Sequence, residues 1–453
     1  MAGFSDILDA CDEAGEYAAR LGIGLLHADD RALDGRKVHI GGEPKLNFSS
    51  CSYLGLELDP RLIEASVEAT RRYGTQFSVS RAFLSAPPYA ELEERLSELT
   101  GGPTIVTPTT SMASLSALTS LVGEGDAVLL DHQVHMTVQL VVPLLQRLGV
   151  PVEFVRHGRL DRLEDRIKVL RERHSKIWFL LDGVYSMHGD LAPMPGLAWL
   201  LSRYEQLHLY IDDAHATGWM GTHGRGHALE HLPDRERAIV ALSLNKSFAS
   251  GGGALVLPDE ATRRRVRNTA GPLLFGGPVQ PPMLGAALAS ARLHLSPELP
   301  KLQAELRQRI EHANARAHEL DLPLLHRQAI VPIRFIGLGP QRASMAMAQH
   351  LLERGLLGSC ALFPAVPGHQ TGMRLSFTRH HRLDDIDRVL GAIAEYLPEA
   401  LAQAGVSRDG LDDAFDLPSR ARGRSSRSDP APAPGEPRLR VQHDTTIDAV
   451  DAD

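Results

Sequence analysis

A series of short, continuous apolar runs, each ended by polar residues, constrains the fold of this chain most strongly. The runs do not alternate between apolar and polar positions, which is typical of strands that helices bury on both faces. Helical patterns lie between them, as at residues 87–102 and 111–125. The runs are TIVT (104–107), DAVLLD (126–131), VPVEFV (150–155), KIWFLLDGVYS (176–186), LHLYIDD (207–213), IVALSL (239–244) and ALVLP (254–258). They predict an α/β domain with three αβα layers and a mostly parallel sheet.

A second pattern begins near residue 297. A long charged helix is expected at 298–320, a strand at 329–338, a helix at 343–355, a strand at 373–378 and a helix at 383–397. This indicates a smaller α+β domain. We therefore divide the chain into an N-terminal helical or extended segment (1–60), a large domain (61–298), a small domain (299–415) and a tail (416–453). The tail is rich in Pro, Ser and Arg, so we expect it to be disordered.

Composition excludes several classes of function. The net charge is −8 with both signs interspersed, so no basic face for nucleic acid is expected. No apolar run approaches the roughly 20 residues that span a bilayer, and the acidic N-terminus does not resemble a signal peptide. The three cysteines (11, 51 and 360) are odd in number and widely spaced, which suits a reducing cytoplasm. None has metal-ligand spacing, so we predict no metal site.

Polar residues follow the apolar runs, and ligands bind at the carboxyl ends of strands in such sheets. The segment Thr107–Ser111 precedes a helix and could bind an anion, although taken alone an ordinary helix cap explains it better. His135 could stack on a planar ligand or be a structural histidine. Asp212 and His215 follow another strand; a metal site is the rival interpretation, but no clear third ligand is present.

Lys246 ends the run IVALSL among small residues. A buried lysine is disfavoured, its pKa should fall, and such lysines commonly form Schiff bases. An anion site, a stacking group, a buried acid and a buried lysine on successive strand ends describe one planar ligand that carries a phosphate and an aldehyde. This ligand is pyridoxal 5′-phosphate.

The chain resembles the α-oxoamine synthases over roughly residues 45–400. NFSSCSYLGLELDP (47–60) is similar to the family's NFSSNDYLGL, and DGVYSMHGDLAPM (182–194) to EGVFSMDGDIAPL. IDDAHATGWMGTHGRG (211–226) closely resembles VDEAHSTGVLGPTGRG, and SLNKSF (243–248) resembles TLGKAF. The stretch FPAVPGHQTGMRLSFTRHH (363–381) resembles the family's P-x-V-P…LRL…HH pattern. This family comprises pyridoxal-phosphate enzymes of fold type I.

The resemblance implies a role for each matching residue. Lys246 would form the Schiff base and move the α-proton, while Asp212 would hold the pyridine nitrogen. His215 would bond the ring 3′-oxygen, His135 would stack on the ring, and Arg374 would bind the amino-acid carboxylate. Further candidate cofactor contacts are Ser243, Thr110, Ser111, Met112, Ser186, Gly276 and Gly277, and further candidate substrate contacts are Cys51, Tyr53 and Arg81.

The family's reaction would then follow: an amino acid and an acyl thioester condense, normally with decarboxylation, to an α-amino ketone. A homodimer with sites at the subunit interface is implied, and an acyl carrier protein is a possible partner. A transaminase or an aldolase-type lyase on the same scaffold is the alternative. A scaffold without catalytic activity is a third, disfavoured by the presence of Lys246, Asp212 and His215.

Four departures from the family's pattern suggest a divergent member. Cys51 stands where the family has Asn, which indicates either a small filler or a changed amino-acid substrate. Tyr89 replaces a His, and His188 replaces an Asp. The segment LLFGGPVQPP (273–282) lacks the family's hydroxyl residues, so backbone N–H groups of Gly276 and Gly277 would replace them at the phosphate.

Overall fold

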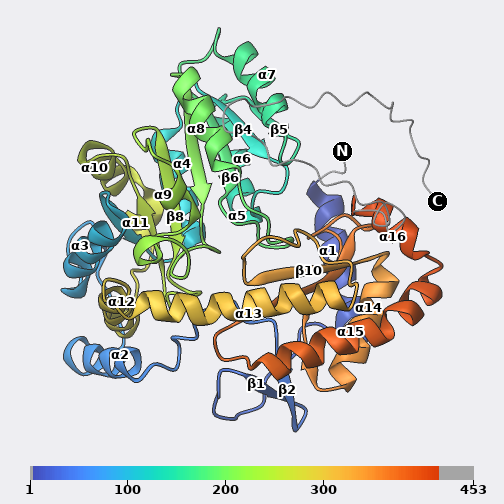
Figure 1. The fold of residues 1–453 in the computed structure, drawn as a ribbon. Coiled ribbons are helices and arrows are strands. Elements are labelled where there is room, and N and C mark those ends of the chain that lie inside the picture. Colours follow the sequence, from blue (N-terminus) through green and yellow to red (C-terminus); the bar gives the residue numbers. More distant parts are fainter. Residues whose placement is uncertain (1–3, 418–453) are drawn as a thin grey trace. The chain divides into compact units, whose positions relative to one another are not determined.

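A seven-stranded sheet forms the centre of the larger part of the chain in the computed structural model, which describes residues 4–417 (Figure 1). Its strand order is β3-β9-β8-β7-β6-β4-β5, and only β9 runs antiparallel to its neighbours. The predicted α/β fold with a mostly parallel sheet is confirmed. The strands are β3 (Thr104–Thr107), β4 (Ala127–Asp131), β5 (Val152–Val155), β6 (Ile177–Asp182), β7 (Leu207–Asp212), β8 (Ala238–Ser243) and β9 (Gly253–Val256).

Alternate residues of each central strand enter two different hydrophobic clusters. In β6, Ile177, Phe179 and Leu181 join one cluster, while Trp178 and Leu180 join the other. The first cluster includes side chains of α3 (Pro88–Thr100), α7 (Leu160–Leu170), α8 (Met194–Arg203) and α12 (Pro281–His294). The second includes side chains of α4 (Thr110–Leu121), α5 (Met136–Gln139), α6 (Val142–Arg147), α10 (Glu260–Thr269) and α11 (Gly271–Phe275). Because both faces are covered, the strands are apolar throughout, as the sequence indicated.

The remaining elements of this part border the sheet. They are α2 (Pro60–Tyr73), which packs on α12, the 3₁₀ helix η1 (Thr222–Gly224) and α9 (His227–His231). The boundaries of β5 differ from the expected run because the strand begins only after Pro151, which cannot donate a backbone hydrogen bond.

A separate cluster of buried side chains surrounds two small sheets, which combine segments from both ends of the chain. One sheet has the order β10-β13-β12, with both neighbours antiparallel, and the other has the order β1-β2-β11. The strands are β1 (Lys37–Ile40), β2 (Glu43–Asn47), β10 (Ile333–Gly339), β11 (Leu356–Leu357), β12 (Ser359–Ala361) and β13 (Thr371–Ser376). The expected strand at 329–338 starts at Ile333, immediately after Pro332.

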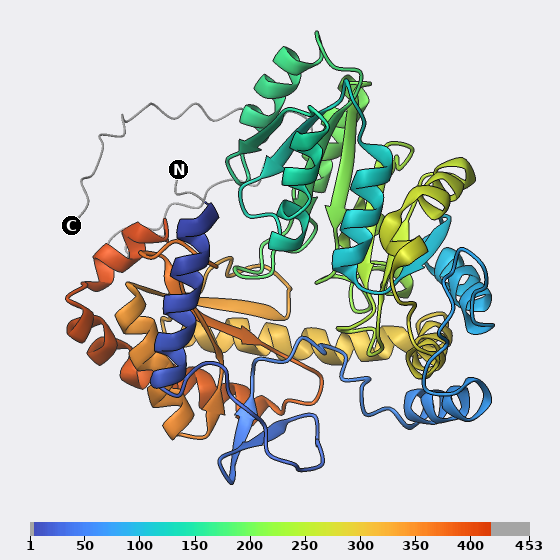
Figure 2. The same cartoon turned by 180° about the vertical axis from the view of Figure 1, so that it is seen from behind.

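Helices cover these small sheets. They are α1 (Phe4–Arg20), α14 (Gln341–Glu353), α15 (Leu383–Ala404) and α16 (Arg408–Ala414). Figure 2 shows α1, in dark blue, beside the orange and red elements, where the Gln349 side chain donates to the carbonyl of Leu21 at 3.3 Å. The helix expected at 383–397 continues to Ala404 with Pro398 inside it, so a proline that sequence reasoning takes as a stop is accommodated here.

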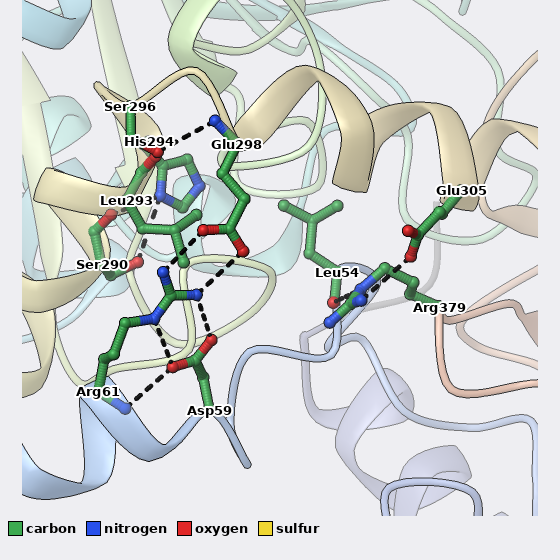
Figure 3. Close-up of polar contacts among 10 residues, drawn as sticks. All are labelled: Leu54, Asp59, Arg61, Ser290, Leu293, His294, Ser296, Glu298, Glu305 and Arg379. Atoms are coloured by element: carbon green, nitrogen blue, oxygen red, sulfur yellow. Dashed lines mark hydrogen bonds and ion pairs between the residues drawn. The ribbon is translucent and has the colours of Figure 1, made fainter.

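Helix α13 (Leu299–Glu319) extends from one part to the other (Figure 1). Its first half packs with Tyr53 and Trp219, and its last turns enter the C-terminal cluster through Ala313 and Ala317. The segment before α2 is fixed to the same helix, as Figure 3 shows. Arg61 bonds both Asp59 and Glu298, and Arg379 bonds Glu305 and the carbonyl of Leu54. Leu54 is thereby tied to the loop after β13, and the start of α2 to the start of α13.

The proposed segment boundaries at residues 60, 298 and 415 remain predictions. Most of the predicted disordered tail lies outside the described residues. Within residues 4–417, no helix is long and apolar enough to cross a membrane.

Candidate active site

Lys246 lies in a tight loop between β8 and β9, and Asn245 closes that loop. The Asn245 side-chain oxygen accepts from the N–H of Gly252 at 2.7 Å, and the Leu244 N–H donates to the Gly252 carbonyl at 3.1 Å. Gly252 has a φ of +109°, which favours glycine. A Cβ on Gly253 would lie 2.7 Å from the backbone nitrogen of Thr110, so glycine there lets α4 approach β9. The two ends of the loop that carries Lys246 thus lie beside Thr110, the first residue of α4.

The amino group of Lys246 faces several acids. Burial lowers its pKa, while the negative charge of Asp212, followed by that of Cys51 and Asp182, opposes this change. The net pKa lies below that of an ordinary lysine. A larger fraction of neutral amine is therefore available to attack an aldehyde or accept a proton.

Two adjacent aspartates end β7, and the structure separates their roles. Asp212, 5% exposed, lies at the carboxyl edge, and its charge acts on His135 and Lys246. Asp213 is turned away and accepts from the N–H of Ala228 at 2.9 Å. Burial raises the pKa of Asp213 to about 7. Asp212 is thus the acid of the candidate site.

A third acid, Asp182, was not selected from the sequence. It ends β6 directly beside Asp212 in the sheet register. Burial, followed by the charge of Asp212, raises the pKa of Asp182 well above its usual range. Its Oδ1 accepts from the backbone N–H of His135 at 3.0 Å. The sequence could have indicated Asp182, because the apolar run KIWFLLD ends in an acid just as LHLYID does.

His135 begins the short helix α5. Its Nδ1 lies 2.8 Å from the hydroxyl of Thr137, which fixes the ring. Burial lowers the pKa of His135, although the charge of Asp212 counteracts part of this effect. The imidazole is therefore neutral near pH 7 and suited to stacking on a planar ligand.

His215 is paired with Tyr53, which comes from the segment before α2. The Tyr53 hydroxyl lies 2.8 Å from Nδ1 of His215, and Tyr53 is fully buried with a φ of +22°. Burial, followed by the charges of Lys246 and Arg374, lowers the pKa of His215 well below its usual range. The Tyr53 contact occupies Nδ1 and leaves Nε2 of a neutral ring for a ligand.

Arg374, on β13, reaches the site from the small sheet. Its Nε donates to the Ser186 carbonyl at 2.6 Å, its Nη1 to the Ser376 hydroxyl at 3.1 Å, and its Nη2 to the Cys51 sulfur at 3.5 Å. Among residues 4–417, no carboxylate forms an ion pair with this buried guanidinium. Burial by itself raises the pKa of Cys51, but Arg374 overcomes this effect and lowers it.

The N-terminus of α4 is the candidate phosphate site. Thr109 caps the helix, and its hydroxyl accepts from the N–H of Met112 at 3.1 Å. The predicted role of Met112 is weakened because its N–H already has an acceptor. The N–H groups of Thr110 and Ser111 belong to the first turn, where the helix supplies no acceptor. Ser243, at the end of β8, is buried nearby: the Thr110 hydroxyl donates to the preceding carbonyl of Leu242 at 3.3 Å.

Arg81, Gly276 and Gly277 have no described contact with this cluster. Arg81 forms a buried ion pair with Glu93 at 2.8 Å and lies over the Tyr89 ring at 3.8 Å. Glu93 is shared with Arg263 and Arg267, and the predicted role of Arg81 as a substrate contact stays a prediction. The Tyr89 hydroxyl accepts from the N–H of Val279 at 2.6 Å, so it supports the loop that holds the two glycines.

The chain is similar to known proteins over most of its length. The sequence matches the family described as aminotransferase class I and II over residues 43–393. The 8-amino-7-oxononanoate synthase of Maricaulis maris is 32% identical over 378 residues, which cover 83% of this chain and 92% of the relative. The chain belongs to the α-oxoamine synthases of the aminotransferase class I and II family.

Solved structures support the fold of this α-oxoamine synthase. The serine palmitoyltransferase of Sphingomonas wittichii has a TM-score of 0.79 at 24% identity, with 89% of this chain and 99% of that one covered. The 8-amino-7-oxononanoate synthase of Francisella tularensis has a TM-score of 0.67 at 22% identity, with 78% and 98% covered. The predictions of fold type I, family, acyltransferase class and pyridoxal-phosphate cofactor are confirmed.

The residues present fit pyridoxal phosphate. Asp212 offers a buried carboxylate for the ring nitrogen, and Lys246 offers an amine with a lowered pKa. The first turn of α4 offers N–H groups for the phosphate. The α-oxoamine synthase fold brings these groups together from the ends of β7 and β8 and the start of α4.

Proposed function

We propose that this site condenses an amino acid with an acyl thioester, and that Arg374 binds the amino-acid carboxylate. The observation that carries this proposal is a buried guanidinium that forms no ion pair with a carboxylate of residues 4–417 and lies close enough to act electrostatically on Lys246 and His215. A buried cation without a carboxylate partner is costly unless an anion completes it. A guanidinium fork matches a carboxylate in geometry.

Each side chain then has one task. Pyridoxal phosphate supplies an aldehyde for the substrate amine and a ring that accepts the electron pair from the α-carbon. Asp212 would accept the N–H of the ring nitrogen, and neutral His215, held by Tyr53, would donate from Nε2 to the 3′-oxygen. Lys246 removes the α-proton, because burial lowers its pKa. The α-carbon displaces the thiol from the acyl group, carbon dioxide leaves, and a returned proton gives the amino ketone.

The finer identity of the partners belongs to the same proposal. The sulfur of Cys51 contacts Arg374 where the substrate carboxylate would bind. This contact supports a preference for a different amino-acid substrate from that of relatives with Asn at this position. We propose a homodimer, a cytoplasmic location and either coenzyme A or a carrier protein as the thiol. Large exposed apolar side chains such as Phe83 and Phe275, each 88% exposed, support a self-association surface.

The test measures thiol release from a panel of acyl-coenzyme A and acyl-carrier thioesters, with and without each of the common amino acids. Release that depends on an amino acid, with an equal amount of carbon dioxide, is the expected result. Transfer of the amino group to a keto acid, without thiol release from any thioester, would contradict the proposal and favour a transaminase.

A further inference from the structure

The loop after β6, residues 183–190, supplies the carbonyl that holds Arg374. The Ser186 carbonyl accepts from Nε of Arg374 at 2.6 Å. This bond connects β13 to the carboxyl edge of the seven-stranded sheet. The direction of the guanidinium therefore depends on the position of this β6 loop.

The β6 loop is narrow and closed at its base. The Tyr185 N–H donates to the Asp190 carbonyl at 3.0 Å, and the Gly189 N–H donates to the Tyr185 carbonyl at 3.1 Å. Gly189 has a φ of +72°, and a Cβ there would lie 2.4 Å from the carbonyl oxygen of Ile333. The loop thus packs against the start of β10, and a shift of Asp190 at its base would move Ser186.

His157, which follows β5, holds Asp190 in place. Its Nε2 lies 2.8 Å from Oδ2 of Asp190, and its Nδ1 lies 2.9 Å from Oδ1 of Asp131 at the end of β4. The edge of its ring contacts Tyr185, with centroids 4.4 Å apart. Burial alone would lower the pKa of His157, but the two carboxylates raise it to about 10. The imidazolium therefore donates to both acids at neutral pH.

Two other histidines near Asp190, His326 and His188, do not replace the bridge that His157 forms between Asp131 and Asp190. His326 Nε2 lies 4.0 Å from Oδ1 of Asp190, beyond hydrogen-bond distance, and the His188 ring packs edge-on against Phe335. Among residues 4–417, no group of three His, Cys, Asp or Glu side chains could hold a metal ion, so the cluster is not a metal site. The Asp131–His157–Asp190 bridge is a structural clamp.

We propose that His157 is a positioning residue for amino-acid binding: by clamping Asp190 to Asp131 it fixes the β6 loop and the Ser186 carbonyl that orients Arg374. The inference rests on the proposed function, in which Arg374 binds the substrate carboxylate.

Cys51 provides a readout that needs no substrate. Its sulfur lies 3.5 Å from Nη2 of Arg374, and the groups that act on its thiol are Arg374, Tyr53 and Lys246. The experiment follows the pH dependence of iodoacetamide reaction at Cys51 in the holoenzyme carrying Cys11→Ser and Cys360→Ser. If Arg374 is displaced in His157→Gln, the midpoint of reaction should rise by about one pH unit.

The matched control is His312→Gln. His312 also pairs with an aspartate, Asp387 at 2.8 Å, but the pair lies between α13 and α15 away from Arg374. This variant should leave the Cys51 profile unchanged. An unchanged profile in His157→Gln would overturn the proposal. Should His157→Gln fail to fold, Asp190→Asn provides the same comparison with the same decisive outcomes.

A second measurement tests the link to the substrate. Amino-acid binding is followed by the change in cofactor absorption in the parent, His157→Gln, Arg374→Lys and the double variant. We expect roughly tenfold weaker amino-acid binding in His157→Gln with unchanged cofactor affinity, and less than about a twofold further loss when Arg374→Lys is present. Additive losses, or an equal loss of cofactor affinity, would refute the clamp. If no amino acid alters the parent spectrum, the proposed function fails, and the Cys51 profile alone decides the clamp.

Discussion

The carboxyl edge of the seven-stranded sheet and the face of the small sheet around β13 treat buried charge differently. At the first, Lys246 faces the carboxylate of Asp212, so opposite charges are brought together. At the second, Arg374 is held by a carbonyl, a hydroxyl and a thiol. This difference suits the first region to a resident cofactor and, under the proposed function, the second region to a substrate anion that binds only transiently.

The largest expected effect comes from removing the amine of the first region. Lys246→Ala should reduce amino-ketone formation by roughly 10³-fold or more, because no other group would move the α-proton. Turnover of the purified variant measures this effect. The control Lys301→Ala removes an exposed lysine of α13 and should retain full activity. Substantial turnover by Lys246→Ala would show that Lys246 is not the group that moves the α-proton.

Asp212→Asn should lower kcat by roughly 10²- to 10³-fold, since the ring nitrogen would lose its charged partner. Steady-state kinetics with both substrates checks this result. Asp213→Asn is the contrast: its carboxylate holds the Ala228 N–H, so that variant should lose stability while retaining the cofactor spectrum. Equal kinetic effects of the two changes would show that the assignment of Asp212 is wrong.

Arg374→Lys should raise the KM for the amino acid by roughly 10- to 100-fold, with a smaller change in kcat, because the carboxylate loses a forked contact. Arg334→Lys is the matched control on the neighbouring strand. Arg334 is also buried, and its Nη1 and Nη2 donate to the carbonyls of Leu325, His326 and Ala329, while its Nε has no partner among residues 4–417. This control should lower thermal stability without changing the KM for the amino acid. A raised KM in Arg334→Lys together with an unchanged KM in Arg374→Lys would contradict the assignment of Arg374 to the substrate carboxylate.

The Asp131–His157–Asp190 clamp should make the thermal stability of the protein depend on pH. The pKa of His157 in the folded protein, about 10, lies above its ordinary 6.5. Its stabilising contribution is therefore fully present below about pH 6.5 and is lost as the pH rises toward about 10. The difference in Tm between the native sequence and His157→Gln should shrink over this interval. A difference that stays constant or grows would contradict the charged bridge.

The smallest expected effect concerns the loop that carries the lysine. Asn245→Ala removes the acceptor of the Gly252 N–H and should cost about 1 kcal/mol of unfolding free energy. Denaturant unfolding measures this change. Asn268→Ala, an exposed asparagine of α10, is the control and should have a free energy of unfolding close to the native value. A neutral Asn245→Ala would mean that the glycines alone shape the loop.

The sequence by itself determined the three-layer fold and the order of strand ends that carry Asp212, His215 and Lys246. Strands buried on both faces read as continuous apolar runs, and an acid or a lysine at their ends is conspicuous because burying a charge is costly. The family resemblance added Arg374 and Cys51 as candidates. It did not indicate that the thiol and the guanidinium are in contact.

Only the tertiary structure decided the relations between distant segments. Arg81 is paired with Glu93, Asp182 supports His135, and His157 bridges Asp131 and Asp190. The Cys51–Arg374 contact joins residues that are 323 positions apart. Local periodicity reports which faces are buried, whereas these pairings depend on which loops the packed sheets and α13 bring together.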